Sequence, residues 1–167
     1  MAKWIMGKGL NRYIEYLQKI NAVADEVIGE AVYEMAKVVA DKARANIQAL
    51  DAAPKGETTY KVSETTIKSR LSEEQKKGLL DGFGVSPMQD DSGYRNVKLG
   101  FDGYNSIKTK KYPKGQPNAL IARVTESGSS YREKAPFMRP AVNASKKPAE
   151  AAGRAKFDER IAAIPQK

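Results

Sequence analysis

The chain has 167 residues, 41% of them hydrophobic, and a formal net charge of +9 at pH 7. That length and hydrophobic content predict one folded domain over residues 1–167. Because the chain contains neither cysteine nor histidine, disulfides, thiolate nucleophiles, thiolate or imidazole zinc sites and the commonest general base are excluded. No apolar run approaches the roughly 20 residues of a membrane span, so we expect a soluble protein made in the cytoplasm.

The N-terminal third of the sequence is patterned as helix. After a short apolar start that could form an edge strand (residues 1–7), apolar side chains recur every three or four residues from Leu10 to Ile20, and Asn21 offers a cap. A second apolar series with nearly the same spacing predicts a long helix over residues 22–48, roughly 40 Å in length. Such a helix could be the backbone of a monomeric core, or part of it could lie against a neighbouring subunit.

The next segment, residues 51–77, is a polar connection. It contains a turn at 53–56 and a possible short strand at 58–62. Ser72 is followed three residues later by Gln75, which is the spacing of a capping box. We therefore expect a short helix that begins after Ser72, runs through Leu80 and ends before Gly82.

Residues 83–104 are expected to form a small antiparallel sheet. Residues 83–87 and 97–101 have the alternating apolar pattern of half-buried strands. The stretch Asp90-Asp91-Ser92-Gly93 between them is typical of a turn, so the two strands could form a hairpin.

A long basic loop follows at residues 105–117. It carries four lysines together with an aromatic residue: Lys108, Lys110, Lys111, Lys114 and Tyr112. Cations interleaved with aromatic rings can neutralise phosphates and stack on bases, and loops of this length are often functional. The alternative is that the lysines only keep an exposed loop soluble. Most of the excess positive charge lies in this half of the chain, because residues 91–135 contain nine basic and four acidic side chains.

The remaining chain is predicted to be helical. Residues 119–127 should form a short helix capped by Asn118 and Gly128. Residues 138–163 should form a C-terminal helical region in which Pro148 either kinks one helix or opens a second. Together these elements predict an α+β fold, in which a long N-terminal helix packs on a small antiparallel β-sheet with a short helix and a C-terminal helix.

The sequence contains no recognisable catalytic motif. The three acidic pairs, at residues 73–74, 90–91 and 158–159, are chain neighbours, and neighbours on a helix point about 100° apart. The glycine-bearing segment 78–84 lacks a phosphate-binding motif, and SGSS at 127–130 lacks the nucleophile-elbow pattern. We therefore expect no enzyme activity, no catalytic residues, no cofactor and no metal.

Two short motifs stand in order near the C-terminus. LIARVTESGSS at residues 120–130 ends a helix in a Glu-x-Gly-Ser turn, and APFMRPA at residues 135–141 follows it. Together they resemble the small head-tail joining or tail-completion proteins of long-tailed double-stranded DNA phages, in which a Pro-Phe-x-Arg-Pro-Ala turn starts the last helix. The long N-terminal helix and the expected sheet region at 83–104 fit that family more loosely.

The resemblance implies a structural subunit of the virion neck or tail end, assembled in the host cytoplasm. Such subunits form a homo-oligomeric ring around the DNA channel, with neighbouring connector and tail proteins as partners. Candidate interface residues lie in the two motifs: Glu126, Pro136, Phe137, Arg139 and Pro140.

Physical arguments assign roles within these motifs. Pro136 and Pro140 fix the backbone on either side of Phe137, so its ring could anchor an intersubunit contact or staple the turn to the chain's own core. Arg139 could pair with Glu126. The basic loop is then expected to reach a neighbouring neck or tail protein. The alternative function is a nucleic-acid-binding module that uses residues 108–114 and the basic C-terminal region.

Overall fold

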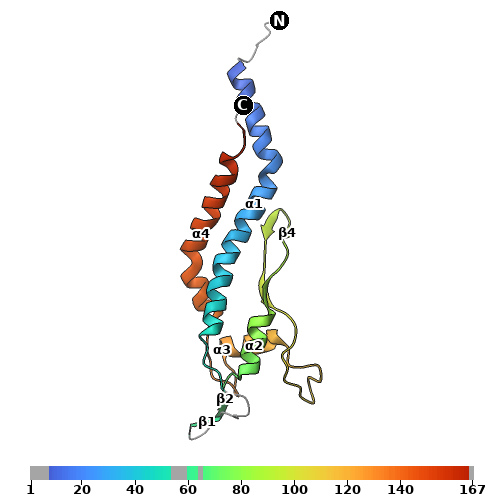
Figure 1. Cartoon of the computed structure of the whole chain (residues 1–167), viewed down its shortest axis with the longest axis vertical. Coiled ribbons are helices and arrows are strands. Elements are labelled where there is room, and N and C mark those ends of the chain that lie inside the picture. The colour runs from blue at the N-terminus through green and yellow to red at the C-terminus, as the bar shows by residue number, and fades with distance from the viewer. Residues whose placement is uncertain (1–7, 54–59, 64–65, 166–167) are drawn as a thin grey trace.

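The computed structural model describes residues 8–53, 60–63 and 66–165, and it confirms an α+β fold. Figure 1 shows two long helices side by side, with the short helices near one end and a hairpin along one of the long helices. The helices are α1 (Lys8–Gln48), α2 (Glu73–Gly82), α3 (Asn118–Ser127) and α4 (Met138–Ala162). The strands are β1 (Tyr60–Ser63), β2 (Thr66–Ser69), β3 (Phe83–Val85), β4 (Gln89–Asp91), β5 (Tyr94–Asn96) and β6 (Leu99–Phe101).

The first helix is longer than the sequence pattern predicts. α1 has 41 residues and continues through Asn21, so the expected break into two helices is wrong. Asn21 is exposed, and one exposed asparagine costs a long helix only a few tenths of a kcal/mol relative to better helix formers. The expected edge strand at residues 1–7 lies outside the described residues.

Helix α1 packs chiefly against α4, and it also contacts β3 and β5 of the hairpin, as the predicted packing on a small sheet requires. The face that α4 turns toward α1 consists of small residues at every fourth position: Ala141, Ser145, Ala149 and Gly153. The helices lie so close that a Cβ atom on Gly153 would come 2.5 Å from Cγ of Met35. Pro148 lies inside α4 without starting a second helix, which settles the two alternatives in favour of one continuous helix.

The main hydrophobic core lies at the end of the molecule where α1 ends and α4 begins. It combines side chains from all four helices, from β3 and from the segments before α2 and α4: Ala40, Ala43, Ile47, Leu71, Leu79, Phe83, Ile121, Ala122, Phe137 and Ala141. Phe101 of β6 joins this core through its ring, whose centroid lies 5.1 Å from that of Phe83. The chain segments that carry the candidate site residues are therefore anchored in one core.

The predicted hairpin is present and is longer than expected. β3 pairs with β6, with Gly84 opposite Gly100, and β4 pairs with β5 farther out. The turn at the tip contains only Ser92 and Gly93, both with positive φ, as a two-residue turn of type I′ requires. Asp90 and Asp91, expected in the turn, belong to β4. The hairpin runs along α1 and is tied to it by the backbone N–H of Met88, which donates to Tyr33 Oη at 2.8 Å.

The polar connection contains a second hairpin, formed by β1 and β2. β1 overlaps the strand expected at 58–62, although residues 54–59, and with them most of the expected turn at 53–56, lie outside the described residues. The capping box is confirmed: Ser72 Oγ accepts from the Gln75 backbone, and Gln75 Oε1 accepts from the Ser72 backbone. α2 then runs to Gly82, two residues beyond Leu80.

The caps of α3 are predicted correctly at one end only. Gly128 ends the helix with a positive φ, and its N–H donates to the Val124 carbonyl. Asn118 does not cap the start of α3, because it is the first residue of the helix and Pro117 holds the cap position. The buried Asn118 side chain instead donates to the carbonyl of Asp102 at 2.8 Å, so tertiary packing of the preceding loop decides its orientation.

Candidate functional site

The two motifs fold as one unit in which the end of α3 holds the beginning of α4. Glu126, in the last turn of α3, accepts hydrogen bonds from the backbone N–H groups of Phe137, Met138 and Arg139 at 2.7, 2.8 and 2.9 Å. These are the first N–H groups of α4, which have no acceptor within the helix. A carboxylate from another helix therefore caps α4, and its negative charge also favours the helix N-terminus.

The environment of Glu126 favours its charged form. Partial burial by itself would raise the pKa of the Glu126 carboxyl. The backbone donors of Phe137, Arg139 and Met138 and the positive charge of Arg139 outweigh that effect and hold the pKa below its ordinary value. The carboxylate is consequently ionised throughout the neutral pH range.

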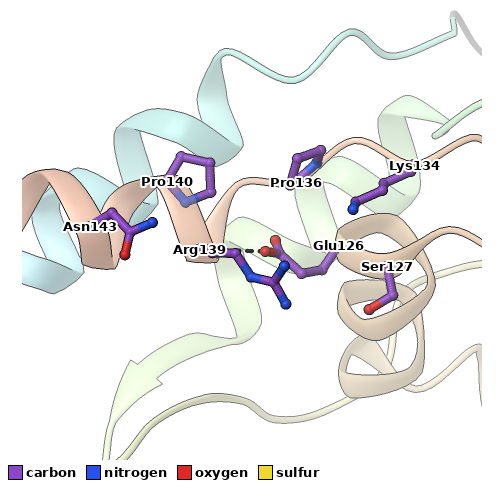
Figure 2. A pocket seen from close by; sticks show the side chains of 7 residues that line it. All are labelled: Glu126, Ser127, Lys134, Pro136, Arg139, Pro140 and Asn143. Atoms are coloured by element: carbon purple, nitrogen blue, oxygen red, sulfur yellow. Dashed lines mark hydrogen bonds between the residues drawn. The ribbon is translucent and has the colours of Figure 1, made fainter.

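Arg139 contacts Glu126 differently from the way the sequence predicts. The hydrogen bond between the two residues comes from the Arg139 backbone, not from its guanidinium, as Figure 2 shows. The Arg139 charge contributes only a longer-range attraction to the carboxylate. The expected side-chain pair is therefore replaced by a helix cap.

Phe137 is the largest fully buried side chain of the described residues, with 1% of its surface exposed. Its ring meets that of Phe101 edge-on at 5.9 Å, and its carbonyl accepts from the Asn46 side chain at 2.9 Å. Of the two predicted roles, the structure supports the staple to the chain's own core. An intersubunit role for this motif stays a prediction, and the ring itself offers a second chain almost no accessible surface.

The prolines of the second motif remain exposed beside the cap. Pro136 precedes Phe137, and Pro140 lies in the first turn of α4, as its fixed φ and missing N–H predict. Both line a shallow surface hollow with Glu126, Ser127, Lys134, Arg139 and Asn143, which Figure 2 shows from close by. Of the candidate interface residues, Pro136, Arg139 and Pro140 are thus the ones that a partner could reach.

The basic loop at 105–117 has an ordered base. Asn105 is 5% exposed, and its Oδ1 accepts from the backbones of Ile107 and Gln116. Gln116 Oε1 accepts from Gln75 Nε2 of α2 at 2.7 Å. Gly115 has a φ of +116°, and a Cβ atom there would lie 2.0 Å from the Asn105 carbonyl oxygen, so this tight approach requires glycine.

The tip of the loop presents its positive charge to solvent. Lys108, Lys110, Lys111 and Lys114 are all exposed, and none of them forms an ion pair with a described residue. Tyr112 is half-buried, with Lys111 Nζ 5.6 Å from its ring centre. The structure therefore holds four uncompensated lysines on a braced loop that projects away from α4 (Figure 1).

The basic C-terminal region is partly neutralised within the chain. Arg160 lies 2.8 Å from Glu26 and 3.1 Å from Glu30, both on α1, and Lys156 lies 3.8 Å from Glu30. These charges contribute to the pairing of α1 with α4. The expectation that the whole region offers free positive charge is therefore too broad.

Sequence reasoning missed a buried polar cluster beneath the two motifs. Arg132 Nη2 donates to Gln75 Oε1 at 2.7 Å and so extends the network that reaches Gln116 and Asn105. Gln75 was expected only as part of a capping box, and nothing in the serine-rich stretch before Arg132 signals burial. These contacts join segments far apart in the sequence, which a local pattern does not reveal.

Comparison of the chain with models of protein families, with curated proteins and with solved structures found no match. In the described part of the chain, no helix has both the length and the apolarity that crossing a membrane requires. Within residues 8–53, 60–63 and 66–165, no three aspartate or glutamate side chains come together as metal ligands would.

Proposed function

We propose that the protein is a structural virion assembly protein of the phage head-tail joint, acting as a ring-forming subunit that links the capsid connector to the tail. The observation that carries this proposal is the unit formed by α3, the intervening turn and α4. Each distinctive residue of the two motifs has a defined place in it: Glu126 caps α4, Phe137 fills the core and Pro140 lies in the first helical turn.

The distribution of exposed groups supports assembly rather than isolated action. The cap leaves Pro136, Arg139 and Pro140 at the surface, while the lysine loop projects on the side away from α4. A closed ring of identical subunits uses two different faces of each subunit for its contacts. In this proposal, the exposed turn belongs to the subunit ring and the lysine loop reaches a neighbouring neck or tail protein.

Particles made without this protein provide the test. We expect electron microscopy to show filled heads and tails that are not joined, and joining to return when the wild-type protein is supplied. A variant carrying Glu126→Ala, which loosens the start of α4, should restore joining less well than one carrying the exposed Glu150→Gln. Normally joined virions in the absence of the protein would contradict the proposal.

A nucleic-acid-binding module is the second candidate, and the four uncompensated lysines favour it. Each phosphate neutralised by a cation steepens the salt dependence of binding by about 0.9 in log K against log salt. Replacing all four loop lysines by glutamine should therefore reduce that slope for duplex DNA by about 3 to 4. The measurement is a binding titration at several salt concentrations.

A charge-matched control distinguishes DNA binding by the loop from a general attraction of DNA to the positively charged protein. Glutamine at Lys37, Lys42, Lys98 and Arg123 removes the same charge from exposed positions outside the loop. If this control weakens DNA binding as much as the loop variant does, binding is nonspecific and this second function is rejected. Unchanged DNA binding in the loop variant would reject it as well.

A further inference from the structure

A small hollow of about 130 Å³ lies beside the buried polar cluster. It is bounded by the residues after α1, the segment between β2 and α2, the end of α3 and the chain leading to α4. Its lining residues are Leu50, Asp51, Ser69, Arg70, Leu71, Thr125, Arg132, Glu133, Lys134 and Ala135. Since a water molecule occupies about 30 Å³ of liquid, the hollow has room for a group the size of a carboxylate or a phosphate.

Arg132 is the only lining side chain that is both charged and buried among the described residues, with 8% of its surface exposed. Its backbone is held in place by reciprocal hydrogen bonds with Ser129, of 3.0 and 3.3 Å, while Ser69 N–H donates to the neighbouring Tyr131 carbonyl. The side chain donates to Gln75 Oε1 at 2.7 Å and, at 3.5 Å, to Thr125 Oγ1. The guanidinium is thus fixed in position by neutral groups.

No carboxylate of the described residues lies within ion-pairing distance of Arg132. The nearby Asp51 pairs with Arg70, and Glu133 is exposed. The lining contains three basic and two acidic side chains, which leaves one positive charge in excess. Burial accordingly lowers the pKa of the Arg132 guanidinium from its ordinary value.

A buried charge without a counter-charge is costly, and buried charges in proteins are normally paired. Neutral acceptors on Gln75 and Thr125 satisfy part of the guanidinium, which has five N–H donors in a rigid fork. The remaining donors match the two oxygens of a carboxylate or the oxygens of a phosphate. Among the residues that the structure describes, no side chain supplies the missing negative charge.

We propose that this hollow is a binding site for a small oxyanion, a carboxylate or a phosphate, held by the fork of Arg132. Thr125, whose Oγ1 accepts from Arg132, and Lys134 also line the hollow. A bound oxyanion would connect α2, α3 and the chain before α4, because Arg132 already links Gln75 to Thr125. The site does not depend on the proposed virion role.

The test uses two probes, inorganic phosphate and acetate, with chloride at matched ionic strength as the reference. Nuclear magnetic resonance of the wild-type protein follows the Nε–Hε signal of Arg132, and the midpoint of thermal unfolding is measured in parallel. We expect a saturable shift of that signal and a rise in the midpoint with at least one probe. A response to phosphate alone identifies a phosphate-bearing ligand, and a response to acetate alone identifies a carboxylate-bearing ligand.

Variants check that Arg132 carries the binding. Followed by the midpoint of thermal unfolding, Arg132→Gln should raise the probe concentration needed for half of the stabilisation at least tenfold, and Arg132→Lys should raise it less, because lysine keeps the charge without the fork. Arg123→Gln, on the exposed face of α3, should bind as the wild type does. The proposal is overturned if neither probe shifts the wild-type Arg132 signal saturably, a measurement that requires no variant to fold.

Discussion

Phe137→Ala is expected to lower the free energy of unfolding by about 4 kcal/mol, within the range measured for buried aromatic side chains. The ring is 1% exposed and meets Phe101 at 5.9 Å, so alanine would leave a cavity bounded by the core residues of α1, α3 and β6. Chemical denaturation of the isolated protein, followed by circular dichroism, measures the loss.

A phenylalanine within α4, the helix that begins directly after Phe137, supplies the control. Phe157 is 39% exposed, and Phe157→Ala should cost far less because less apolar surface returns to water. Phe137→Leu should fall between the two, since leucine fills most of the space. If Phe137→Ala left the unfolding of the isolated chain unchanged, the assignment of this ring to the core would be wrong.

Glu126→Ala is expected to lower the free energy of unfolding by about 2 kcal/mol, because three N–H groups at the start of α4 lose a charged acceptor. Glu126→Gln should cost less at neutral pH, since its amide oxygen can still accept while the charge is lost. Glu150→Gln, at an exposed position farther along α4, is the matched control for Glu126→Gln and should change stability little.

The stability difference between the wild type and Glu126→Gln should depend on pH. The folded protein holds the pKa of Glu126 below its ordinary value, whereas a glutamate in the unfolded chain titrates near about 4.3. The charged Glu126 cap therefore contributes its full stabilisation above the pKa of the unfolded chain, and this stabilisation is lost as pH falls through the lower pKa of the folded protein. A difference that stays constant from pH 7 to pH 3 would exclude a charged cap.

The elements that sequence predicts well are those fixed by neighbours in the chain. The Ser72–Gln75 capping box and the Gly128 helix end depend on residues within a few positions of each other, and the structure confirms both. The predicted cap at the start of α3 is wrong for the opposite reason. Asn118 is a residue type that suits a helix cap, but its side chain donates to the carbonyl of Asp102, far from it in the sequence. The break expected at Asn21 fails because packing along α1 outweighs one weak helix former.

In the candidate site, too, the features set by the local sequence are predicted well, and those set by contacts between distant segments are not. Pro140 lies in the first turn of α4 as its ring geometry predicts, and the exposure of the loop lysines follows from their charge. The sequence predicts that Glu126 contacts Arg139, which is correct, but it predicts a contact with the guanidinium, whereas the backbone N–H of Arg139 is the donor. A sequence motif does not show which donor faces the carboxylate. The burial of Arg132 required contacts with α2 and α3 that only the assembled fold contains.

The pairing of the first helix with the last has a consequence for how the protein is made. Gln48 ends α1 and Met138 begins α4, so 90 positions separate the two partners in the sequence. At about 5–20 residues per second, a ribosome needs about 5–20 s to cover that distance. Throughout that interval, Ala31 and Met35 of α1 lack Gly153 of α4, against which they lie in the finished protein. The helix can form locally, but it can dock on α4 only after α4 has been synthesised, so shortening α4 should leave this face of α1 exposed and lower the yield of soluble protein.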